Sequence, residues 1–327
     1  MSEFANGGAL AAMAETGVVP VINIPRPELA APLARALCEG GIPLIEVTLR
    51  NDTALESLRR IRREVPQMRV AAGTVLTCEQ ADAALEAGAE LLVTPGFNPR
   101  VVRHCLDAGA PVLPGCVTPT EIEAGREMGL RVFKFFPAEQ LGGVKTIREL
   151  CGPYRDVRFV ATSGITFKNI PEYLSSPHVA AVGGSCMAPV ALVQAEDWAG
   201  ISALCREAMR AALGFRIMHV GVNHATAAEG EASARRLACI FDLPYAQGGR
   251  SDFAGTAVEC CKQPFPGANG HIAIGTFSVE RAVACLRRRG VRFREEFKNV
   301  AANGELIAVY LEEEIGGFAI HLLKCDR

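Results

Sequence analysis

The sequence lacks a surplus of basic charge and a long apolar run, and each absence excludes a class of protein. Lys and Arg total 34 against 36 for Asp and Glu, which gives a formal net charge of −2. A dedicated nucleic-acid or anionic-membrane binder would show a basic excess. Every apolar run is broken well short of a membrane span. We therefore expect neither nucleic acid nor a membrane as a partner.

Paired cysteine motifs are also missing. The 12 cysteines are scattered without CxxC spacing, and the adjacent Cys260-Cys261 is no metal motif. In a chain this long such cysteines are typical of reduced, mostly buried thiols. The segment MSEFANGGAL has an acid and no basic cluster, unlike a signal peptide. We expect a cytoplasmic protein.

What the sequence does contain is an alternation of apolar strand-like runs and amphipathic helix-like stretches. Its 327 residues predict about two domains. Strands rich in Val, Ile and Leu with polar C-terminal ends are typical of parallel strands covered by helices. Eight such runs lie in the first two thirds: VVPVINI, LIEVTLR, VAAGTVL, LLVTPGF, PVLPGCV, VFKFFPA, RFVATSGI and VAAVGGSC.

Eight strand–helix units in about 200 residues predict an α/β fold, a (β/α)8 barrel over residues 1–213. An open doubly wound sheet is the alternative, although no GxGxxG follows the first strand. Asn51 or Asp52 suits the N-cap of the helix that follows the second strand.

In such a barrel the active site lies at the C-terminal ends of the strands. Glu46, Thr48 and Arg50 alternate along the second strand and therefore share one face. Lys134 and Phe136 share a face of the sixth strand. The other strands end in Thr74, in Thr94-Pro95, in Thr162-Ser163-Gly164 and in Gly183-Gly184-Ser185.

Lys134 is the most informative of these residues, because it lies between phenylalanines. It could be a snorkelling lysine at a strand edge or a structural partner of Glu46. Alternatively, desolvation and a cation such as Arg50 would lower its pKa and free the amine to attack carbonyls. The glycine-rich ends of strands seven and eight could bind a phosphate through backbone N–H groups, or could simply form tight turns.

With these residues in place, the segment from about residue 17 to 213 resembles the 2-keto-3-deoxy-6-phosphogluconate (KDPG) aldolase family, which includes the 4-hydroxy-2-oxoglutarate (KHG) aldolases. The matching motifs run in order along the barrel: VVPV, GGIPLIEVTLR, AAGTVL, TPGF, PGCVTPTE, VFKFFPAE, GGVK, GPY and VGGS.

The resemblance implies a class I aldolase that forms a Schiff base and needs no cofactor. Lys134 would attack the 2-oxo carbon, and Glu46 would be the general acid and base. Arg50 and Thr74 would hold the substrate carboxylate. Pro95 and Phe136 would line the pocket. The distal phosphate would be received by five residues, namely Thr162, Ser163, Gly164, Gly184 and Ser185.

The main departure from the family is Ser163, which stands where relatives usually have glycine. The aldolase chemistry is unaffected, but the phosphorylated substrate becomes less certain. The resemblance therefore implies cleavage of KDPG to pyruvate and glyceraldehyde 3-phosphate, with cleavage of KHG to pyruvate and glyoxylate as the alternative. It also implies a homo-oligomer, typically a trimer.

The rhythm changes after Leu213, and a strand–helix–strands pattern occurs twice, about fifty residues apart. FRIMHVGVNH opens the first round and GHIAIGTF the second. This internal duplication predicts a smaller α+β domain, residues 214–327, that docks on the barrel or extends its assembly.

The motifs MHVGV, GHIAIGTFSVERAV and LRRRGVRF resemble the glyoxalase / vicinal-oxygen-chelate superfamily, built from paired βαβββ modules. The positions that match its metal ligands are His219, Glu259, His271 and His321, all types that bind divalent ions. His321 departs from the usual Glu, and His224 is a spare loop candidate. The alternatives are a metal-dependent lyase, epimerase or dioxygenase, or a module for ligand binding or oligomerisation only.

Overall fold

The computed structural model describes residues 8–325, and the chain divides into two compact units between Ala212 and Leu213. The boundary predicted from the sequence lies one residue later, after Leu213. No helix in the described part is both long and apolar enough to cross a membrane. All 12 cysteines lie within that part and are free thiols.

The first unit is built on a parallel sheet. Among residues 8–212 eight strands are hydrogen-bonded in the order β5-β4-β3-β2-β1-β8-β7-β6. Each predicted strand segment contains one of them. Their bounds are β1 (Val18–Ile22), β2 (Leu44–Thr48), β3 (Arg69–Gly73), β4 (Leu91–Val93), β5 (Val112–Leu113), β6 (Val132–Phe135), β7 (Arg158–Thr162) and β8 (Val179–Gly184).

Backbone hydrogen bonds beyond the end of β5 join it to β6. The Lys134 N–H donates to the Pro114 carbonyl at 2.8 Å, and the Cys116 N–H donates to the Lys134 carbonyl at 2.9 Å. These two bonds bring the two outer strands of the sheet together, so the sheet curls into a barrel. The predicted (β/α)8 barrel is confirmed.

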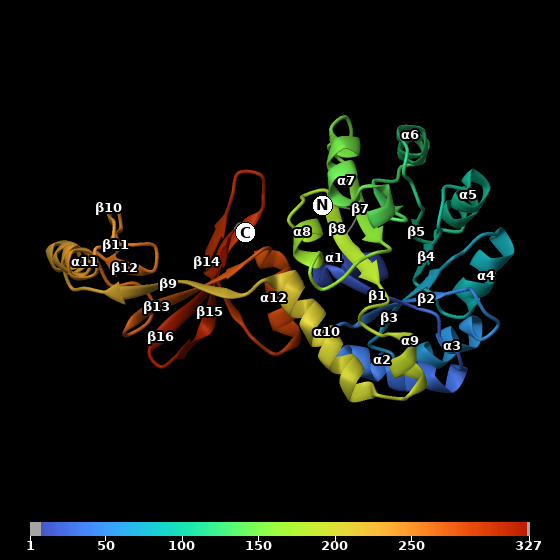
Figure 1. Cartoon of the computed structure of the whole chain (residues 1–327), viewed down its shortest axis with the longest axis horizontal. Coiled ribbons are helices and arrows are strands. Elements are labelled where there is room, and N and C mark those ends of the chain that lie inside the picture. The colour runs from blue at the N-terminus through green and yellow to red at the C-terminus, as the bar shows by residue number, and fades with distance from the viewer. Residues whose placement is uncertain (1–7, 326–327) are drawn as a thin grey trace. The chain divides into compact units, whose positions relative to one another are not determined.

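Helices surround the strands of the first unit, as Figure 1 shows. They cover the outside of the barrel because an amphipathic helix buries its apolar side against the strands. Their bounds are α1 (Ala9–Thr16), α2 (Ala30–Glu39), α3 (Ala54–Glu64), α4 (Cys78–Glu86), α5 (Pro99–Asp107), α6 (Pro119–Glu127), α7 (Gly143–Cys151), α8 (Ile170–Leu174), α9 (Val190–Gln194) and α10 (Trp198–Leu213), with 3-10 turns η2 (Pro27–Leu29) and η3 (Glu139–Leu141).

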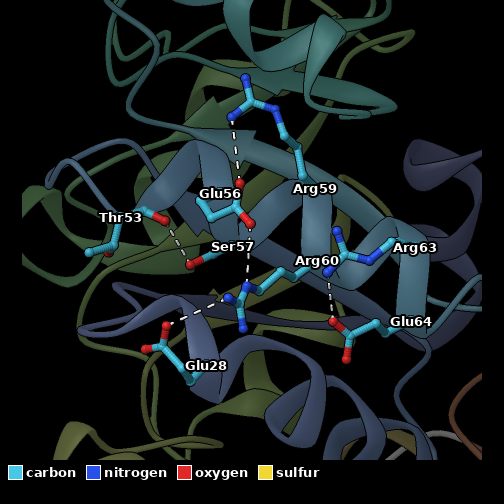
Figure 2. Close-up of polar contacts among 8 residues, drawn as sticks. All are labelled: Glu28, Thr53, Glu56, Ser57, Arg59, Arg60, Arg63 and Glu64. Atoms are coloured by element: carbon cyan, nitrogen blue, oxygen red, sulfur yellow. Dashed lines mark hydrogen bonds and ion pairs between the residues drawn. The ribbon is translucent and has the colours of Figure 1, made fainter.

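Helix α3 illustrates the amphipathic character of the outer layer. Its buried side includes Leu58 and Ile61, while its outer side carries ion pairs, among them Arg60 to Glu56 at 3.3 Å. Figure 2 shows these contacts together with the side chain of Thr53. The predicted N-cap was wrong, because α3 begins at Ala54 with Thr53 at the N-cap position. The exposed pairs stabilise the fold little, because water screens them.

The second unit is one mixed sheet built from two similar modules. Within residues 213–325 eight strands run in the order β10-β11-β12-β9-β13-β16-β15-β14. The first module comprises β9 (Arg216–Asn223), α11 (Ala227–Phe241), β10 (Tyr245–Gln247), β11 (Ser251–Ala254) and β12 (Val258–Cys261). The second comprises β13 (Gly270–Thr276), α12 (Val279–Arg288), β14 (Phe293–Val300), β15 (Leu306–Ile315) and β16 (Phe318–Lys324).

The two modules meet at their first strands. β9 and β13 pair antiparallel, and each also pairs in parallel with the last strand of its own module, β12 or β16. Four strands that carry ligand-capable residues are therefore neighbours in the middle of the sheet. The predicted pair of βαβββ modules is confirmed.

Candidate active site and candidate metal centre

Lys134 and Glu46 face each other inside the barrel. The Lys134 Nζ lies 3.0 Å from Glu46 Oε1, although the two residues are 88 positions apart in the sequence. Lys134 is only 7% exposed and Glu46 only 1%. The contact joins an amine and a carboxylate on β6 and β2, out of bulk water. Such a pair can pass a proton to or from a substrate that binds beside it.

The strand alternation of β6 explains why the lysine points inward. Its neighbour Phe133 packs outward against α6, where a Cβ at Gly125 would come within 2.4 Å of the Phe133 ring. Since successive side chains of a strand point to opposite faces, Lys134 points into the barrel. The flanking ring on its own side is Phe136, whose centroid lies 5.8 Å from Nζ. Burial in the barrel, rather than a cage of phenyl rings, desolvates the amine.

Gly73 at the end of β3 makes room for the Glu46 side chain. A Cβ at this position would lie 2.3 Å from Glu46 Oε1 and 2.9 Å from its Cδ. Any other residue would push the carboxylate away from its place beside Lys134. Gly73 was not predicted as a site residue. Its only signal is a glycine inside a strand, which often marks a close approach of another group.

The next strand end brings two predicted carboxylate-binding residues together. Arg50 Nε donates to Thr74 Oγ1 at 3.4 Å, and the Arg50 side chain is exposed just beyond β2. Thr74 has a φ of 61°, a left-handed conformation that is costly for a residue with a branched Cβ. Thr48 instead donates to the Ile22 carbonyl at 3.3 Å. Pro95 follows β4 and is half-buried.

Thr162 ends β7 with a buried hydroxyl that has no hydrogen-bond partner. A buried hydroxyl without a partner is unfavourable, so a bound ligand oxygen would stabilise it. The next residue, Ser163, has a φ of 82° and donates to Gln140 Oε1 at 3.3 Å. Gly164 is also left-handed, with a φ of 78°. This strand end therefore has an unusual backbone and a free polar group.

The other predicted phosphate residues lie at the end of β8, where Gly184 is half-buried and Ser185 is exposed. Two residues that the sequence analysis missed support the neighbouring turn. The buried Tyr173 hydroxyl donates to Glu139. A Cβ at Gly164 would lie 2.4 Å from the Glu139 side chain, so Gly164 is needed there for its small size as well as its conformation.

In the second unit the four predicted ligand residues come together on the middle strands. One imidazole nitrogen from each of His219, His271 and His321 lies within 4.8 Å of the other two. Glu259 Oε2 lies 3.0 Å from His219 Nε2 and 3.2 Å from His271 Nε2. Strands from both modules contribute, so the cluster depends on the pairing of β9 with β13.

His321 has no hydrogen-bond partner on either ring nitrogen, and the Nδ1 of His271 also lacks one. Both side chains are more than nine-tenths buried. Burial and then the neighbouring imidazoles lower the pKa of His321 to about 4, so its ring is neutral near pH 7. A neutral imidazole with a free nitrogen is the form that binds a metal ion.

Glu259 is the anion of the cluster. Burial raises its pKa, but hydrogen bonds from the two imidazoles and from Ser251 outweigh this effect and hold the pKa well below its usual range. The Ser251 hydroxyl donates to Oε1, which leaves Oε2 for the histidines. Ser251 was not predicted, because a serine on a strand carries no distinctive signal.

Aromatic rings surround the cluster and fix its orientation. The Tyr310 ring stacks on His321, with centroids 4.7 Å apart and planes 21° apart. Phe253 lies edge-on to His219, and Phe265 to His271. His224 lies outside the cluster, where its ring nitrogens contact the Val222 carbonyl and Ser233.

Three donors of the cluster are spaced as the ligands of one divalent ion would be. Donor atoms bound about 2.1 Å from one ion stand about 3.0 to 3.4 Å apart. The separations of 3.0, 3.2 and 3.3 Å among Glu259, His219 and His271 lie in this range, and one ring nitrogen of His321 lies within 4.8 Å of a nitrogen of each of the other two imidazoles. One of the two unpartnered nitrogens of His321 is a group that such an ion would satisfy.

Comparison with known proteins locates a close resemblance in the barrel. The family model described as KDPG and KHG aldolase matches residues 10–204. A 2-dehydro-3-deoxy-phosphogluconate aldolase of Treponema pallidum is 48% identical over 199 residues, which are 61% of this chain and 95% of that protein. A KHG/KDPG aldolase of Escherichia coli K12 is 41% identical over 195 residues, 60% of this chain and 92% of that protein.

Solved structures show the same similarity. The KDPG aldolase of Legionella pneumophila, with pyruvate captured at low pH as a covalent carbinolamine intermediate, is 37% identical with a TM-score of 0.59. The match covers 61% of this chain and 97% of that one. The aldolase of Zymomonas mobilis ZM4 with 3-phosphoglycerate is 40% identical with a TM-score of 0.58, over 61% of this chain and 93% of that one.

Proposed function

Because the chain belongs to the KDPG and KHG aldolase family, we propose that its barrel is a Schiff-base aldolase that cleaves KDPG to pyruvate and glyceraldehyde 3-phosphate. The observation that carries this proposal is the buried Lys134 amine, 3.0 Å from the Glu46 carboxylate inside the barrel. A solved relative holds pyruvate as a covalent carbinolamine, which is the intermediate that such an amine forms with a ketone.

The proposed reaction uses these two groups in turn. The Lys134 amine attacks C2 of the substrate to form a carbinolamine. Glu46 then donates a proton to the carbinolamine hydroxyl, which leaves as water. The resulting iminium draws in the electron pair of the C3–C4 bond. Glu46 accepts the C4 hydroxyl proton as that bond breaks, and the aldehyde departs. The remaining enamine takes up a proton at C3, and water then releases pyruvate and restores the amine.

The surrounding residues would bind the two ends of the substrate. Arg50 and Thr74 lie together and suit the carboxylate, because a guanidinium binds a carboxylate through two parallel hydrogen bonds. Pro95 and Phe136 line the space between. The distal phosphate is assigned to the strand ends with the unpartnered hydroxyl and the glycines, namely Thr162, Ser163, Gly164, Gly184 and Ser185.

Trapping with borohydride tests the assignment of Lys134. Borohydride reduces an imine with pyruvate to a stable amine, which mass spectrometry can locate on the Lys134 peptide. We expect stoichiometric labelling of the wild type and of Lys145→Ala, a control on the exposed side of α7. Lys134→Ala should remain unlabelled. Labelling of that variant at unchanged yield would contradict the proposal.

KHG is the second candidate substrate of the same lysine, favoured by Ser163 at the proposed phosphate site. A side chain there leaves less room for the phosphate, and the Escherichia coli relative is named for both substrates. Side-by-side cleavage assays of KDPG, its C4 epimer and KHG decide between them. We propose that KDPG has the highest kcat/KM; a higher value for KHG would reverse the assignment.

For the second unit we propose a glyoxalase / vicinal-oxygen-chelate-like module that binds one divalent metal through His219, Glu259, His271 and His321. The order of its strands and the unpartnered nitrogens of His321 support this proposal. A bound ion would act as a Lewis acid on a substrate oxygen. Metal analysis after loading should give one equivalent per chain, and less than about a tenth would contradict it. Aldolase activity should survive EDTA, because the barrel reaction needs no ion.

The remaining proposal concerns assembly. We propose a homotrimer, on the basis of the resemblance of the barrel to the aldolase family. Light scattering on the eluting protein gives the mass directly. A monomer at micromolar concentration would contradict the proposal.

A further inference from the structure

His321 is the residue that gives the cluster of the second unit its chemical character. The cluster brings together three imidazoles and one carboxylate, Glu259. Neutral nitrogen donors suit Co²⁺, Ni²⁺ and Zn²⁺, whereas Mg²⁺, Ca²⁺ and Mn²⁺ prefer oxygen donors. A divalent ion here would keep a net charge of about +1, because only one ligand is an anion.

We propose that this one-carboxylate, three-imidazole cluster selects Co²⁺, Ni²⁺ or Zn²⁺ over Mn²⁺ and Mg²⁺, and that His321 sets this preference. The inference rests on the proposed metal site of the second unit and adds the class of ion that it takes. It depends on His321 because, within the described residues, that is the one histidine of the cluster with no hydrogen-bond partner on either ring nitrogen.

The surroundings hold His321 in place for this task. Its ring is stacked on Tyr310 and lies 5.1 Å, centroid to centroid, from the ring of His271. Its backbone is fixed by the parallel pairing of β16 with β13, in which His321 stands beside Ala273. Ala273 is also paired with His219 on β9, so a small side chain stands between these two histidines. The ring is therefore fixed before the ion arrives, which reduces the entropy cost of binding.

Gly221 serves the same arrangement from β9. It is paired with His271, and a Cβ at Gly221 would lie 2.0 Å from the Cε1 of that imidazole. The His271 ring thus lies over the backbone of β9, and this position carries its Nε2 to within 3.3 Å of the His219 Nε2. A side chain at Gly221 would displace a nitrogen donor.

Equilibrium competition against a chelating dye tests the selectivity, with the untagged full chain and NiCl2, ZnCl2, MnCl2 and MgCl2 as probes. The background is Cys239→Ser, because Cys239 is an exposed thiol that could bind soft ions by itself. We expect one equivalent of Ni²⁺ or Zn²⁺ bound at least about 100-fold more tightly than Mn²⁺. The absorption spectrum of the Co²⁺ form should lack a thiolate charge-transfer band.

His321→Glu is the decisive variant, because it introduces a second carboxylate into the cluster. The ratio of the Mn²⁺ to the Ni²⁺ dissociation constant should fall by at least about 10-fold. His224→Ala is the matched control, since His224 lies in the same unit but outside the cluster. It should leave the ratio unchanged.

The possible results separate the two proposals. If no ion binds to the wild type, the metal site itself fails and the selectivity fails with it. If the ions bind but His321→Glu leaves the ratio unchanged, the site stands and the role of His321 is overturned. Should His321→Glu fail to fold by circular dichroism, His321→Asn replaces it, with an expected loss of Ni²⁺ affinity of about 10- to 100-fold. An unchanged affinity in that variant overturns the inference.

Discussion

Replacing Gly73 by alanine should impair the barrel reaction without removing a group that touches the substrate. The new Cβ would stand 2.3 Å from Glu46 Oε1 and 2.9 Å from both Cδ and Cγ. Since carbon and oxygen atoms in contact rarely approach closer than about 3.2 Å, the carboxylate must move by about 1 Å. The atoms it meets belong to a flexible side chain, so the barrel should still fold.

The size of the effect follows from this displacement. The Lys134–Glu46 contact of 3.0 Å would lengthen to about 4 Å, beyond hydrogen-bond reach. A misplacement of about 1 Å can cost about 100-fold in rate. We expect Gly73→Ala to lower kcat by about 10- to 100-fold, which is a barrier increase of about 1.4 to 2.7 kcal/mol. Glu46→Gln should lose more, about 100- to 10,000-fold, because it removes the proton-transfer group.

The assay couples pyruvate release from KDPG to lactate dehydrogenase and measures kcat and KM separately. Gly249→Ala is the control, because a Cβ at Gly249 in the second unit meets no atom within 4 Å. Borohydride trapping on the same samples shows whether the imine still forms. Wild-type kcat in a folded Gly73→Ala protein would refute the claim that the position of Glu46 limits the reaction.

Two further predictions concern the strained strand end and the thiols. Ser163→Gly should raise the free energy of unfolding by about 0.5 kcal/mol, because relief of the left-handed conformation exceeds the cost of the added entropy of the unfolded chain. A lower free energy of unfolding, measured by urea denaturation, would show that the hydrogen bond to Gln140 outweighs the strain. Burial raises the pKa of Cys151 and Cys205 to about 12, so both thiols stay protonated at pH 8. Iodoacetamide should therefore label the exposed Cys239 first, as followed by mass spectrometry. Labelling of either buried thiol at the rate of Cys239 would contradict this.

The fold could be predicted where apolar runs are regular. The eight barrel strands were located because each lies in a short, mostly apolar run, and even the two-residue β5 lies inside its predicted segment. β14 was harder to place, because FREEFKNV is almost entirely exposed and shows no alternation. The start of α3 was also missed. Three consecutive residues, Asn51, Asp52 and Thr53, are all suited to capping, and sequence alone could not choose among them.

The side chains that bear the chemistry were easier to predict than those that position them. Lys134 and Glu46 stand out as charged residues in apolar strands, and the structure brings them together. Ser251 and Tyr310, in contrast, are ordinary residues of strands, and their roles depend on which strands become neighbours. The pairing of β9 with β13 joins segments about fifty residues apart, and no local pattern encodes such a pairing.

Two glycines beside the proposed functional residues show why positioning residues are hard to predict from the sequence. Gly73 leaves room for Glu46, and Gly221 leaves room for the His271 ring; in each case the side chain belongs to the adjacent strand. A carboxylate or imidazole that must reach a partner across a sheet has to pass over a neighbouring backbone, and only a position without a Cβ allows that path. The sequence shows each glycine in the motifs AAGTVL and MHVGV but not what passes over it. A glycine beside a polar residue of a neighbouring strand therefore gains its meaning only once the register is known, and in both units that register makes the glycine as necessary to the site as the side chain it accommodates.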